Sequence, residues 1–557
     1  MDDERRHRLL LRCALTITSL AVCTLAACLA WLAWSGSTKQ YDYLVRLPDG
    51  SPRVTLDECA ESRVTAFCGD CHALPRPESF PRDAWHREVR QGYEKYILSK
   101  RNDLDPPPMQ LTIAYYRSRA PEKLVFPEPD EAETELQATF VTQYFASGLK
   151  TDVPPAVSHL RYARLDPDET PVLLACDMRS GGIAAIDVRN GQAPPQLLAR
   201  LNNPCRIEPC DLDGDQSVDL VVADLGSYFP FDHDRGRVVW LRRREKEGAF
   251  EQVVLAAGLG RVADVRPADF DSDGDLDLIV AEFGYYKTGG VALLRNVAAG
   301  GERPRFEPEV LDSSPGTIHT PVHDFDKNGR PDFLALVSQE QESLNVFLNQ
   351  PNGSFRHQTL WTAPDLTFGS SGIQLIDLDQ DGDVDVLQTN GDSFDTPFVS
   401  PSHGVQWFEN LGSLRFAYHR LTDMTGAYCA RAGDVDLDGD LDVVAVAWLS
   451  SRFKPPNTPF ASLPSILCLE QTSPGTFVRH TLERGLPHYP TLELADFDDD
   501  GDLDFALGLH VMTSRISNTP ETPHRLSIWW NQVIADSNSV PLSQETDRHN
   551  RHNPSIE

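Results

Sequence analysis

The apolar positions of this chain form two patterns, one long run near the start and many short runs further on. Residues 13–34 (CALTITSLAVCTLAACLAWLAW) carry no charge, and a basic segment at 1–12 precedes them. An apolar helix of about 20 residues spans the hydrocarbon core of a bilayer, and basic residues favour its cytoplasmic side. We therefore predict a cytoplasmic segment at 1–12 and an uncleaved transmembrane helix at 13–34.

Two other interpretations of this segment also export the rest of the chain. A cleaved signal peptide has a similar basic start but a shorter apolar core. Leu25-Ala26-Ala27-Cys28 resembles the processing box of bacterial lipoproteins, with Cys28 as the lipidated residue, although the chain stays apolar just beyond it. All three interpretations place the bulk of the chain outside the cytoplasm, in a periplasm or at the cell surface.

The short apolar runs recur in register with acidic segments. These segments start at Asp211, Asp269, Asp324, Asp377, Asp434 and Asp496, spaced 53–62 residues apart. Self-similarity at such a period indicates one supersecondary unit repeated along the chain. Each acidic segment leads into a strand such as LVVADL or LIVAEF, and a second strand phrase such as GVALLRN or LNVFLNQ follows. About four short strands per unit are typical of a propeller blade.

Alternating carboxylates in these six acidic loops suit Ca²⁺, which takes about 6–8 oxygen ligands. Loop positions 1, 3 and 5 are expected to point oxygens inward, and position 9 to close the cage. The predicted ligands are Asp211, Asp213, Asp215 and Asp219; Asp269, Asp271, Asp273 and Asp277; Asp324, Asp326, Asn328 and Asp332; Asp377, Asp379, Asp381 and Asp385; Asp434, Asp436, Asp438 and Asp442; and Asp496, Asp498, Asp500 and Asp504. An EF-hand would need Glu at position 12 and flanking helices, and these loops have neither. We expect up to six calcium ions, the weakest in the third loop, where Asn328 and Arg330 reduce the negative charge.

The loops and strands resemble the VCBS and FG-GAP family of calcium-binding propeller repeats, as in the head of the integrin α-chain. The resemblance covers residues 141–532 and implies a mainly β fold in which calcium stabilises the blades. Residues 162–168, followed by PVLLACDM, look like a degenerate first blade that has lost its acidic cage. We therefore predict a seven-bladed β-propeller, with six and eight blades as the alternatives.

Cys68-Gly69-Asp70-Cys71-His72 has the C-x-x-C-H pattern through which c-type haem is attached. Its two thiols can reach the two vinyl groups of one porphyrin, and the imidazole of His72 then lies over the iron. A thioredoxin-like pair would need a βαβ context, and a zinc site would need a second Cys or His pair nearby. The sequence shows neither, so we predict one covalent haem c.

Met109 is the predicted sixth iron ligand. It follows three prolines and precedes a predicted helix that begins at Leu111 and ends near Ala120. This arrangement resembles a small class I cytochrome c over residues 57–122, which implies a small all-α domain with His/Met ligation and a raised reduction potential. His86, in a predicted exposed helix, is the alternative ligand.

Composition changes this picture in only one respect. The chain has 83 acidic and 51 basic residues, which argues against a nucleic-acid partner because phosphate binding needs clustered Lys and Arg.

Residues 35–56 and 123–140 are predicted linkers, and 533–557 a disordered tail. Cys205 and Cys210 are candidates for a disulfide in the exported environment.

These features predict a membrane-anchored, extracytoplasmic haem protein that transfers electrons, with a propeller that binds a partner or substrate. A haem with both axial positions filled has no open site for substrate, so an electron carrier is favoured over a self-contained enzyme. The alternatives are a haem-containing oxidoreductase with its substrate site on the propeller, and an integrin-like adhesion module. The sequence identifies no catalytic residue and leaves the redox partner unknown.

Overall fold

The computed structural model describes residues 45–46, 52–53, 56–70, 73–127, 131, 135–145, 153–191, 193–244, 250–298, 303–339, 341–365, 367–392, 398–450, 460–485, 487–512 and 525–533. The predicted membrane segment at 13–34, together with Cys71 and His72, lies outside these residues. Within them, no helix has both the length and the apolar character needed to cross a bilayer. The described residues divide into two compact units. One holds 45–46, 52–53, 56–67 and 85–118, and the other holds 68–70, 73–84 and the described residues from 119 onward.

The smaller unit is helical. Its helices are α2 (Glu58–Cys68, which ends at the unit boundary), α3 (Trp85–Leu98) and α4 (Met109–Arg119), and a short ladder of β1 (Val45–Arg46) and β2 (Pro52–Arg53) precedes them. Aromatic side chains hold the helices together. Trp85 stacks on Tyr116 with ring centroids 3.9 Å apart, and Phe67 lies 5.0 Å from Tyr93. The Tyr93 hydroxyl donates to the Pro107 carbonyl at 2.5 Å, which fixes the proline-rich segment before α4.

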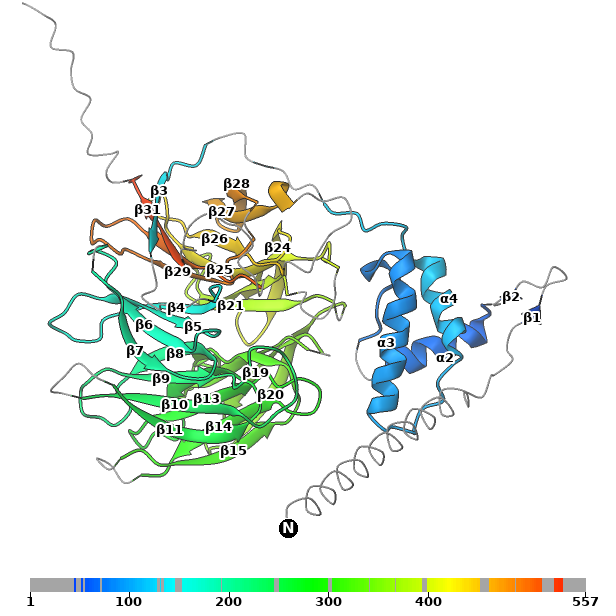
Figure 1. The fold of residues 1–557 in the computed structure, drawn as a ribbon, viewed down its shortest axis with the longest axis horizontal. Coiled ribbons are helices and arrows are strands. Elements are labelled where there is room, and N and C mark those ends of the chain that lie inside the picture. The colour runs from blue at the N-terminus through cyan, green and yellow to red at the C-terminus, as the bar shows by residue number, and fades with distance from the viewer. Residues whose placement is uncertain are drawn as a thin grey trace, which may run out of the picture. The chain divides into compact units, whose positions relative to one another are not determined.

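The larger unit is a β-propeller in which the described strands form seven sheets of at least four strands each (Figure 1). Blade 1 comprises β4 (Val157–Ala163), β5 (Val172–Asp177), β6 (Gly182–Ile186) and β7 (Gln196–Arg200); blade 2 β8 (Pro204–Cys210), β9 (Asp219–Asp224), β10 (Gly236–Arg243) and β11 (Phe250–Leu259); blade 3 β12 (Val262–Ala268), β13 (Asp277–Glu282), β14 (Gly290–Asn296) and β15 (Phe306–Asp312). Blade 4 comprises β16 (Thr317–His319), β17 (Val322–His323), β18 (Asp332–Val337), β19 (Ser343–Asn349) and β20 (Phe355–Thr362); blade 5 β21 (Ser370–Ile376), β22 (Asp385–Asn390), β23 (Gly404–Asn410) and β24 (Phe416–Asp423). Blade 6 comprises β25 (Ala427–Gly433), β26 (Asp442–Ala447), β27 (Pro464–Ser473) and β28 (Thr476–Arg484); blade 7 β29 (Thr491–Ala495), β30 (Asp504–Gly508), β31 (Leu526–Asn531) and β3 (Phe140–Phe145). Short 3₁₀ turns occur at Pro77–Ser79, Arg82–Ala84 and Phe460–Ser462.

Blade 7 closes the ring with strands from both ends of the propeller sequence. Its first three strands come from the C-terminal part, and its outer strand β3 comes from the N-terminal part. β3 pairs antiparallel with β31, with Phe140 opposite Asn531 and Phe145 opposite Leu526. The prediction of seven blades is therefore confirmed, and the degenerate segment at 162–168 lies in blade 1 as predicted.

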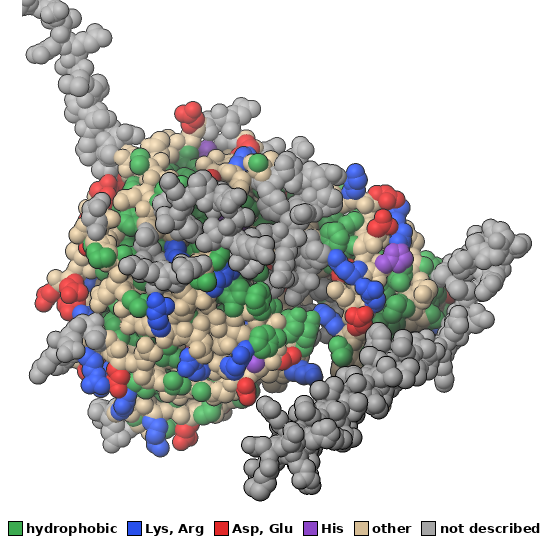
Figure 2. Space-filling model, viewed as in Figure 1, with side chains coloured by type: hydrophobic (Ala, Val, Ile, Leu, Met, Phe, Trp, Pro, Cys, Tyr) green, Lys and Arg blue, Asp and Glu red, His purple; other side chains and the backbone are tan. Residues whose placement is uncertain are grey.

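The second strand of most blades is buried along its whole length. All six residues of β9, β18, β22 and β26 are buried. Because neighbouring blades cover both faces of these strands, the sequences of β9, β18 and β26 are mostly continuous apolar runs rather than alternating ones. β22 instead buries the polar residues Gln388, Thr389 and Asn390. The outer strands alternate instead, and Figure 2 shows acidic and basic side chains interspersed over the visible propeller surface.

Candidate metal centres

Each acidic loop joins the first strand of a blade to its second strand, and loop position 9 is the first residue of that second strand. Asp219 begins β9, for example, and Asp442 begins β26. The backbone of the loop is exposed at its tip, whereas the position 9 side chains are at most 1% exposed: Asp219, Asp277, Asp332, Asp385, Asp442 and Asp504. Each loop thus holds a buried carboxylate at its base.

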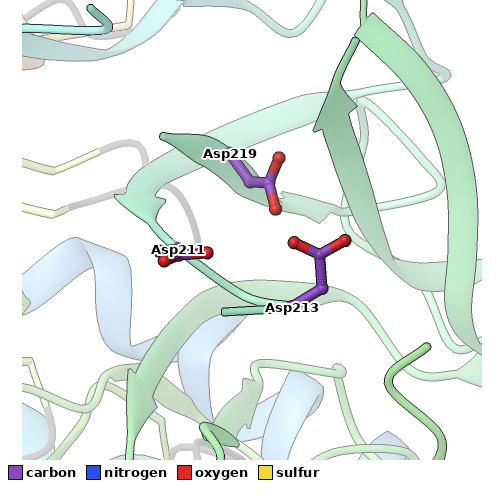
Figure 3. A group of neighbouring side chains, drawn as sticks. All are labelled: Asp211, Asp213 and Asp219. Atoms are coloured by element: carbon purple, nitrogen blue, oxygen red, sulfur yellow. The ribbon is translucent and has the colours of Figure 1, made fainter. Parts of the chain in front are cut away.

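The loops bring their carboxylates together. Oxygen atoms of positions 1, 3 and 9 lie within 4.8 Å of one another in four loops: Asp211, Asp213 and Asp219; Asp324, Asp326 and Asp332; Asp377, Asp379 and Asp385; Asp434, Asp436 and Asp442. The second loop gathers positions 1, 3 and 5 in the same way: Asp269, Asp271 and Asp273. Figure 3 shows Asp211, Asp213 and Asp219 with their carboxylates turned toward a common space.

Position 1 also organises the backbone of its own loop. In all six loops its carboxylate accepts a hydrogen bond from the backbone N–H of position 6, as in Gly329 N–H to Asp324 at 2.7 Å. Positions 4 and 6 have positive φ in every loop. At position 4 this conformation is taken mostly by residues other than Gly, such as Ser272 (φ 62°) and Leu437 (φ 61°). An L side chain in this region is strained by about 1–2 kcal/mol, so the loop contacts must hold it there.

The position 9 carboxylate binds backbone on two sides. One oxygen of Asp332 accepts the N–H of Phe325 in the loop (2.9 Å), and the other accepts the N–H of Asn349 at the end of β19 (2.7 Å). Burial raises the pKa of Asp332 to about 6, against the opposing effect of these hydrogen bonds. Burial likewise raises the pKa of Asp442 to about 7. A cation in the loop would restore the charged form of these carboxyls.

The donor set fits a hard divalent cation. Asp211 Oδ1, Asp213 Oδ1 and Asp434 Oδ1 are buried, yet none accepts a hydrogen bond in the described part of the chain. A buried carboxylate oxygen without a partner is unfavourable, and a bound cation would satisfy it. Clustered carboxylate oxygens are the ligands that Ca²⁺ prefers.

The acidic loops differ in the residue that the third strand of the same blade, such as β10 in blade 2, places beside the clustered carboxylates. Arg242 pairs with Asp213 at 2.7 Å in the first loop, and Arg295 with Asp271 at 3.4 Å in the second. In blades 5 and 6 the corresponding residues are Glu409 and Glu470. Burial and neighbouring aspartates raise the pKa of Asp379 and Asp436, and these glutamates raise it further. In the third loop, which the sequence predicts to be weakest, Arg330 Nε donates to the Asn349 carbonyl at 3.0 Å, and Asn328 Nδ2 contacts the same carbonyl at 3.4 Å.

Blade 1 replaces the acidic cage with basic side chains. Its loop carries Arg164 at position 1 and Val172 at position 9. Arg243 of the adjacent blade donates to the Leu165 carbonyl and pairs with Asp166 at 3.0 Å. A guanidinium therefore binds the position 3 carboxylate of this loop, and Asp168 at position 5 is a second carboxylate that remains.

Sequence reasoning missed an amide that ties three of the loops to the next blade. Asn349 Nδ2 donates to the Phe270 carbonyl in the loop of blade 3 (2.7 Å), and Gln471 Nε2 to the Leu378 carbonyl in blade 5 (3.2 Å). Asn531 Nδ2 contacts the Val435 carbonyl in blade 6 in the same way (2.7 Å). The signal was present in the sequence, since the strand phrases GVALLRN, LNVFLNQ, SILCLEQ and LSIWWNQ each carry an amide residue near their ends.

Only part of the predicted haem site falls within the described residues. Cys68 is half-buried at the end of α2, and His86 is exposed on α3. Met109 is half-buried and is the first residue of α4, so the helix begins two residues earlier than predicted. Cys71 and His72 lie outside the described residues.

The suggested disulfide between Cys205 and Cys210 is wrong. Both residues lie on β8, and both are free thiols. Residues five apart in a strand point to opposite faces and are separated by roughly 16 Å, far beyond the reach of a disulfide.

The innermost strands carry a buried ion-pair network. Arg206 contacts Asp264 at 2.8 Å and Glu208 at 3.0 Å, and Arg266 contacts Glu208 at 2.8 Å and Asp264 at 3.0 Å. Burial alone would raise the pKa of Asp264, but Arg206 and Arg266 outweigh it and hold that pKa well below its ordinary value. These four side chains therefore satisfy one another's charge along the inner strands of blades 2 and 3.

Comparison with known proteins bears on the repeats. The sequence model for the FG-GAP-like repeat matches residues 211–280 and 324–387, which include the first four acidic loops. The chain contains FG-GAP-like repeats. No curated protein sequence matches the chain. The FG-GAP-like propeller is similar in fold to the crystal structure of Sqt1 from Saccharomyces cerevisiae, with 10% identity, a TM-score of 0.38, and coverage of 64% of this chain and 80% of that chain. It is also similar to BBS1N crystallised with ARL6DN and soaked with lead, with 11% identity, a TM-score of 0.41, and coverage of 71% of this chain and 97% of that chain.

Proposed function

We propose that this chain is an exported, membrane-anchored c-type haem protein that transfers electrons, and that its FG-GAP-like propeller is a calcium-stabilised binding module. The observation that carries the propeller part is the cage geometry, in which loop carboxylates converge within 4.8 Å around buried oxygens that accept no hydrogen bond. A seven-bladed propeller with FG-GAP-like repeats is consistent with a recognition role. The haem part rests on the C-x-x-C-H motif at 68–72.

The described helices are compatible with this proposal. Cys68 ends a helix. The helical unit has an aromatic core, with Phe67 against Tyr93 and Trp85 stacked on Tyr116. When bound, haem c supplies reversible one-electron transfer. The chain would hold it through Cys68, Cys71 and His72.

The test of the haem proposal uses the full chain made in a host that attaches haem c. We expect the mass of the protein to rise by one porphyrin, and its visible spectrum to change reversibly with dithionite. Cys71→Ser should reduce covalent attachment, whereas Cys59→Ser, which removes an exposed thiol outside the motif, should leave it unchanged. A mature protein without porphyrin would overturn the electron-transfer function and leave a binding propeller.

Met109 is the proposed sixth ligand, and His86 supplies its control. Met109→Ala should alter the reduced spectrum and lower the reduction potential, because a thioether ligand favours the reduced iron. His86→Ala should change neither, since its imidazole is exposed on α3. The reverse pattern would assign the sixth position to His86.

A further inference from the structure

A cavity outside the acidic loops lies beside blades 5 and 6. Its volume is about 420 Å³. Arg479 and Arg484 of β28, His403 before β23, and Leu463 line it, together with Phe126 from the segment that follows the helical unit. Nothing in the proposed electron-transfer function uses this cavity.

The chain places one of its own carboxylates in this cavity. Glu131 accepts hydrogen bonds from Arg484 Nη2 and from the Thr481 hydroxyl, both at 2.8 Å, and from Arg479 Nε at 3.3 Å. Partial burial opposes ionisation, but Thr481 and the two guanidinium groups outweigh it and lower the pKa of Glu131. Three donors from one strand therefore converge on a single carboxylate that lies far from them in sequence.

The three donors Arg479, Thr481 and Arg484 form a clamp around Glu131, and the main guanidinium of this clamp is held in place by the fold. The side chain of Arg479 is only 6% exposed. Its Nη1 donates to the Thr422 hydroxyl at 2.8 Å and to the Asp423 carbonyl at 2.6 Å, so the guanidinium is fixed with Nε toward Glu131. Such a pre-organised guanidinium loses little freedom when it binds a carboxylate.

The cavity also offers an aromatic pocket and one unused donor. Phe126 packs against Val399, Leu449 and Leu463. His403 is 2% exposed, and its Nδ1 accepts the N–H of Gly426 at 3.3 Å, which places the ring proton on Nε2. That Nε2 is buried and has no hydrogen-bond partner among the described residues. A ligand with a further oxygen acceptor would satisfy it.

We propose that this cavity is a binding site for an acidic peptide with an aromatic anchor, and that Phe126 and Glu131 of the chain itself are its resident ligand groups. The occupant is a peptide because Phe126 and Glu131, two of the groups that line the cavity, belong to one polypeptide segment and lie five residues apart. A partner segment with the same spacing would displace them, and the segment after the helical unit would then be released from the propeller. The inference is independent of the haem.

The probe is a labelled peptide with the sequence of residues 125–133, VFPEPDEAE. Full-length chains are compared by fluorescence anisotropy, one intact and one with Phe126→Ala and Glu131→Gln. The double variant should bind the peptide about tenfold more tightly than the intact chain, because its own groups no longer compete. In that background Arg484→Ala should weaken binding about tenfold, and Arg356→Ala, on the exposed face of β20, should not change it.

Three outcomes would overturn the proposal. The double variant fails to bind the peptide while its propeller still melts cooperatively. Alternatively, a peptide with Gln at the position of Glu131 binds equally well, which removes the carboxylate clamp. Finally, free glutamate competes as effectively as the peptide, in which case the site takes a small carboxylate and not a peptide. If the double variant unfolds, Arg484→Ala alone in the intact chain supplies the test. It should release the segment and raise its hydrogen exchange, and unchanged exchange also contradicts the proposal.

Discussion

The side-chain amide of Asn349, at the end of β19, donates to the backbone carbonyl of Phe270 in the acidic loop of the preceding blade, at 2.7 Å. The backbone N–H of the same residue donates to Asp332, the buried carboxylate of its own blade, at 2.7 Å. One asparagine thus connects the acidic loops of two neighbouring blades. A change in the charge or geometry of one acidic loop can therefore affect the contact between two blades as well as the blade that contains the loop.

Asn349→Ala should destabilise the propeller by about 1–3 kcal/mol, because it leaves two buried carbonyl groups without their donor. Asn349 is fully buried, and its amide also reaches the Pro331 carbonyl at 3.3 Å. The measurement is thermal unfolding of the full chain followed by circular dichroism. Asn352→Ser is the matched control, since Asn352 lies in the exposed turn just beyond β19 and Ser keeps an acceptor for the Ser354 N–H. Equal melting temperatures for the two variants would contradict the role of the amide.

Removal of calcium should destabilise the propeller more at neutral pH than in mild acid. In the metal-free fold, burial raises the pKa of Asp219 from its ordinary value of 3.8 to about 6, and that of Asp504 to about 7. Between the ordinary pKa of 3.8 and the raised pKa of each carboxyl, the folded state binds more protons than the unfolded state. The unfolding free energy of the metal-free chain therefore falls as pH rises through this range. Bound calcium would favour the charged carboxylates and so offset this loss.

Melting temperatures of dialysed and calcium-loaded protein, compared near pH 5 and near pH 7, test this expectation. The gap between the two forms should widen toward neutral pH, and calcium addition at neutral pH should release protons. A gap independent of pH would mean that the buried carboxyls are charged without the metal.

Gln216→Gly should stabilise the propeller. Gln216 occupies loop position 6 of the first acidic loop with φ at 68°, whereas the other five loops have glycine there. Relief of the left-handed backbone strain stabilises the folded state by about 1 kcal/mol. Glycine is also more flexible than glutamine in the unfolded chain, and this greater freedom offsets part of the gain. We expect a net gain of about 0.5 kcal/mol in the unfolding free energy. Gly274→Ala is the inverse control. A Cβ at Gly274 meets nothing within 4 Å, so any loss of stability there comes from the backbone alone.

The sequence was informative where a feature recurs within one blade. Six acidic loops and the strand phrases between them predicted the propeller, its blade count, and the degenerate first blade around Asp166. The left-handed residues at position 4 were not predictable, because Ser272 and Leu437 give no local signal for positive φ.

Features that join distant parts of the chain were beyond reach of a single sequence. β3 is an ordinary alternating strand, and nothing local pairs Phe140 with Asn531. The contact of Glu131 with Arg479 likewise spans most of the propeller sequence. The prediction that the third loop is the weakest site, because Asn328 and Arg330 reduce its charge, stays a prediction. The sequence did not show that Arg242 pairs with a predicted ligand of the first loop.

Arg242→Gln should strengthen calcium binding at the first acidic loop. The Arg242 guanidinium lies 2.7 Å from Asp213 and 3.7 Å from Asp215, so a cation must displace it to use these oxygens. Loss of this internal competitor is worth about 1 kcal/mol, or roughly fivefold in affinity. Native mass spectrometry at increasing free calcium concentration counts the bound ions. The last ion to bind, which we expect to occupy the first acidic loop, should bind the Arg242→Gln variant at a lower calcium concentration than the unaltered chain. Arg295→Gln should have a smaller effect, since Arg295 is 3.4 Å from Asp271 and is shared with Glu309.

Asp211→Asn tests whether the first loop binds the last ion. This variant should bind one ion fewer and should bind the other ions at unchanged calcium concentrations. Arg356→Gln controls for the loss of one positive charge at a distance from the cages. If Arg356→Gln shifts the binding of the last ion as much as Arg242→Gln does, the effect comes from net charge rather than from competition. If Arg242→Gln shifts nothing, the guanidinium and the cation do not use the same oxygens, and the order of affinities must depend on the Glu409 and Glu470 side chains instead.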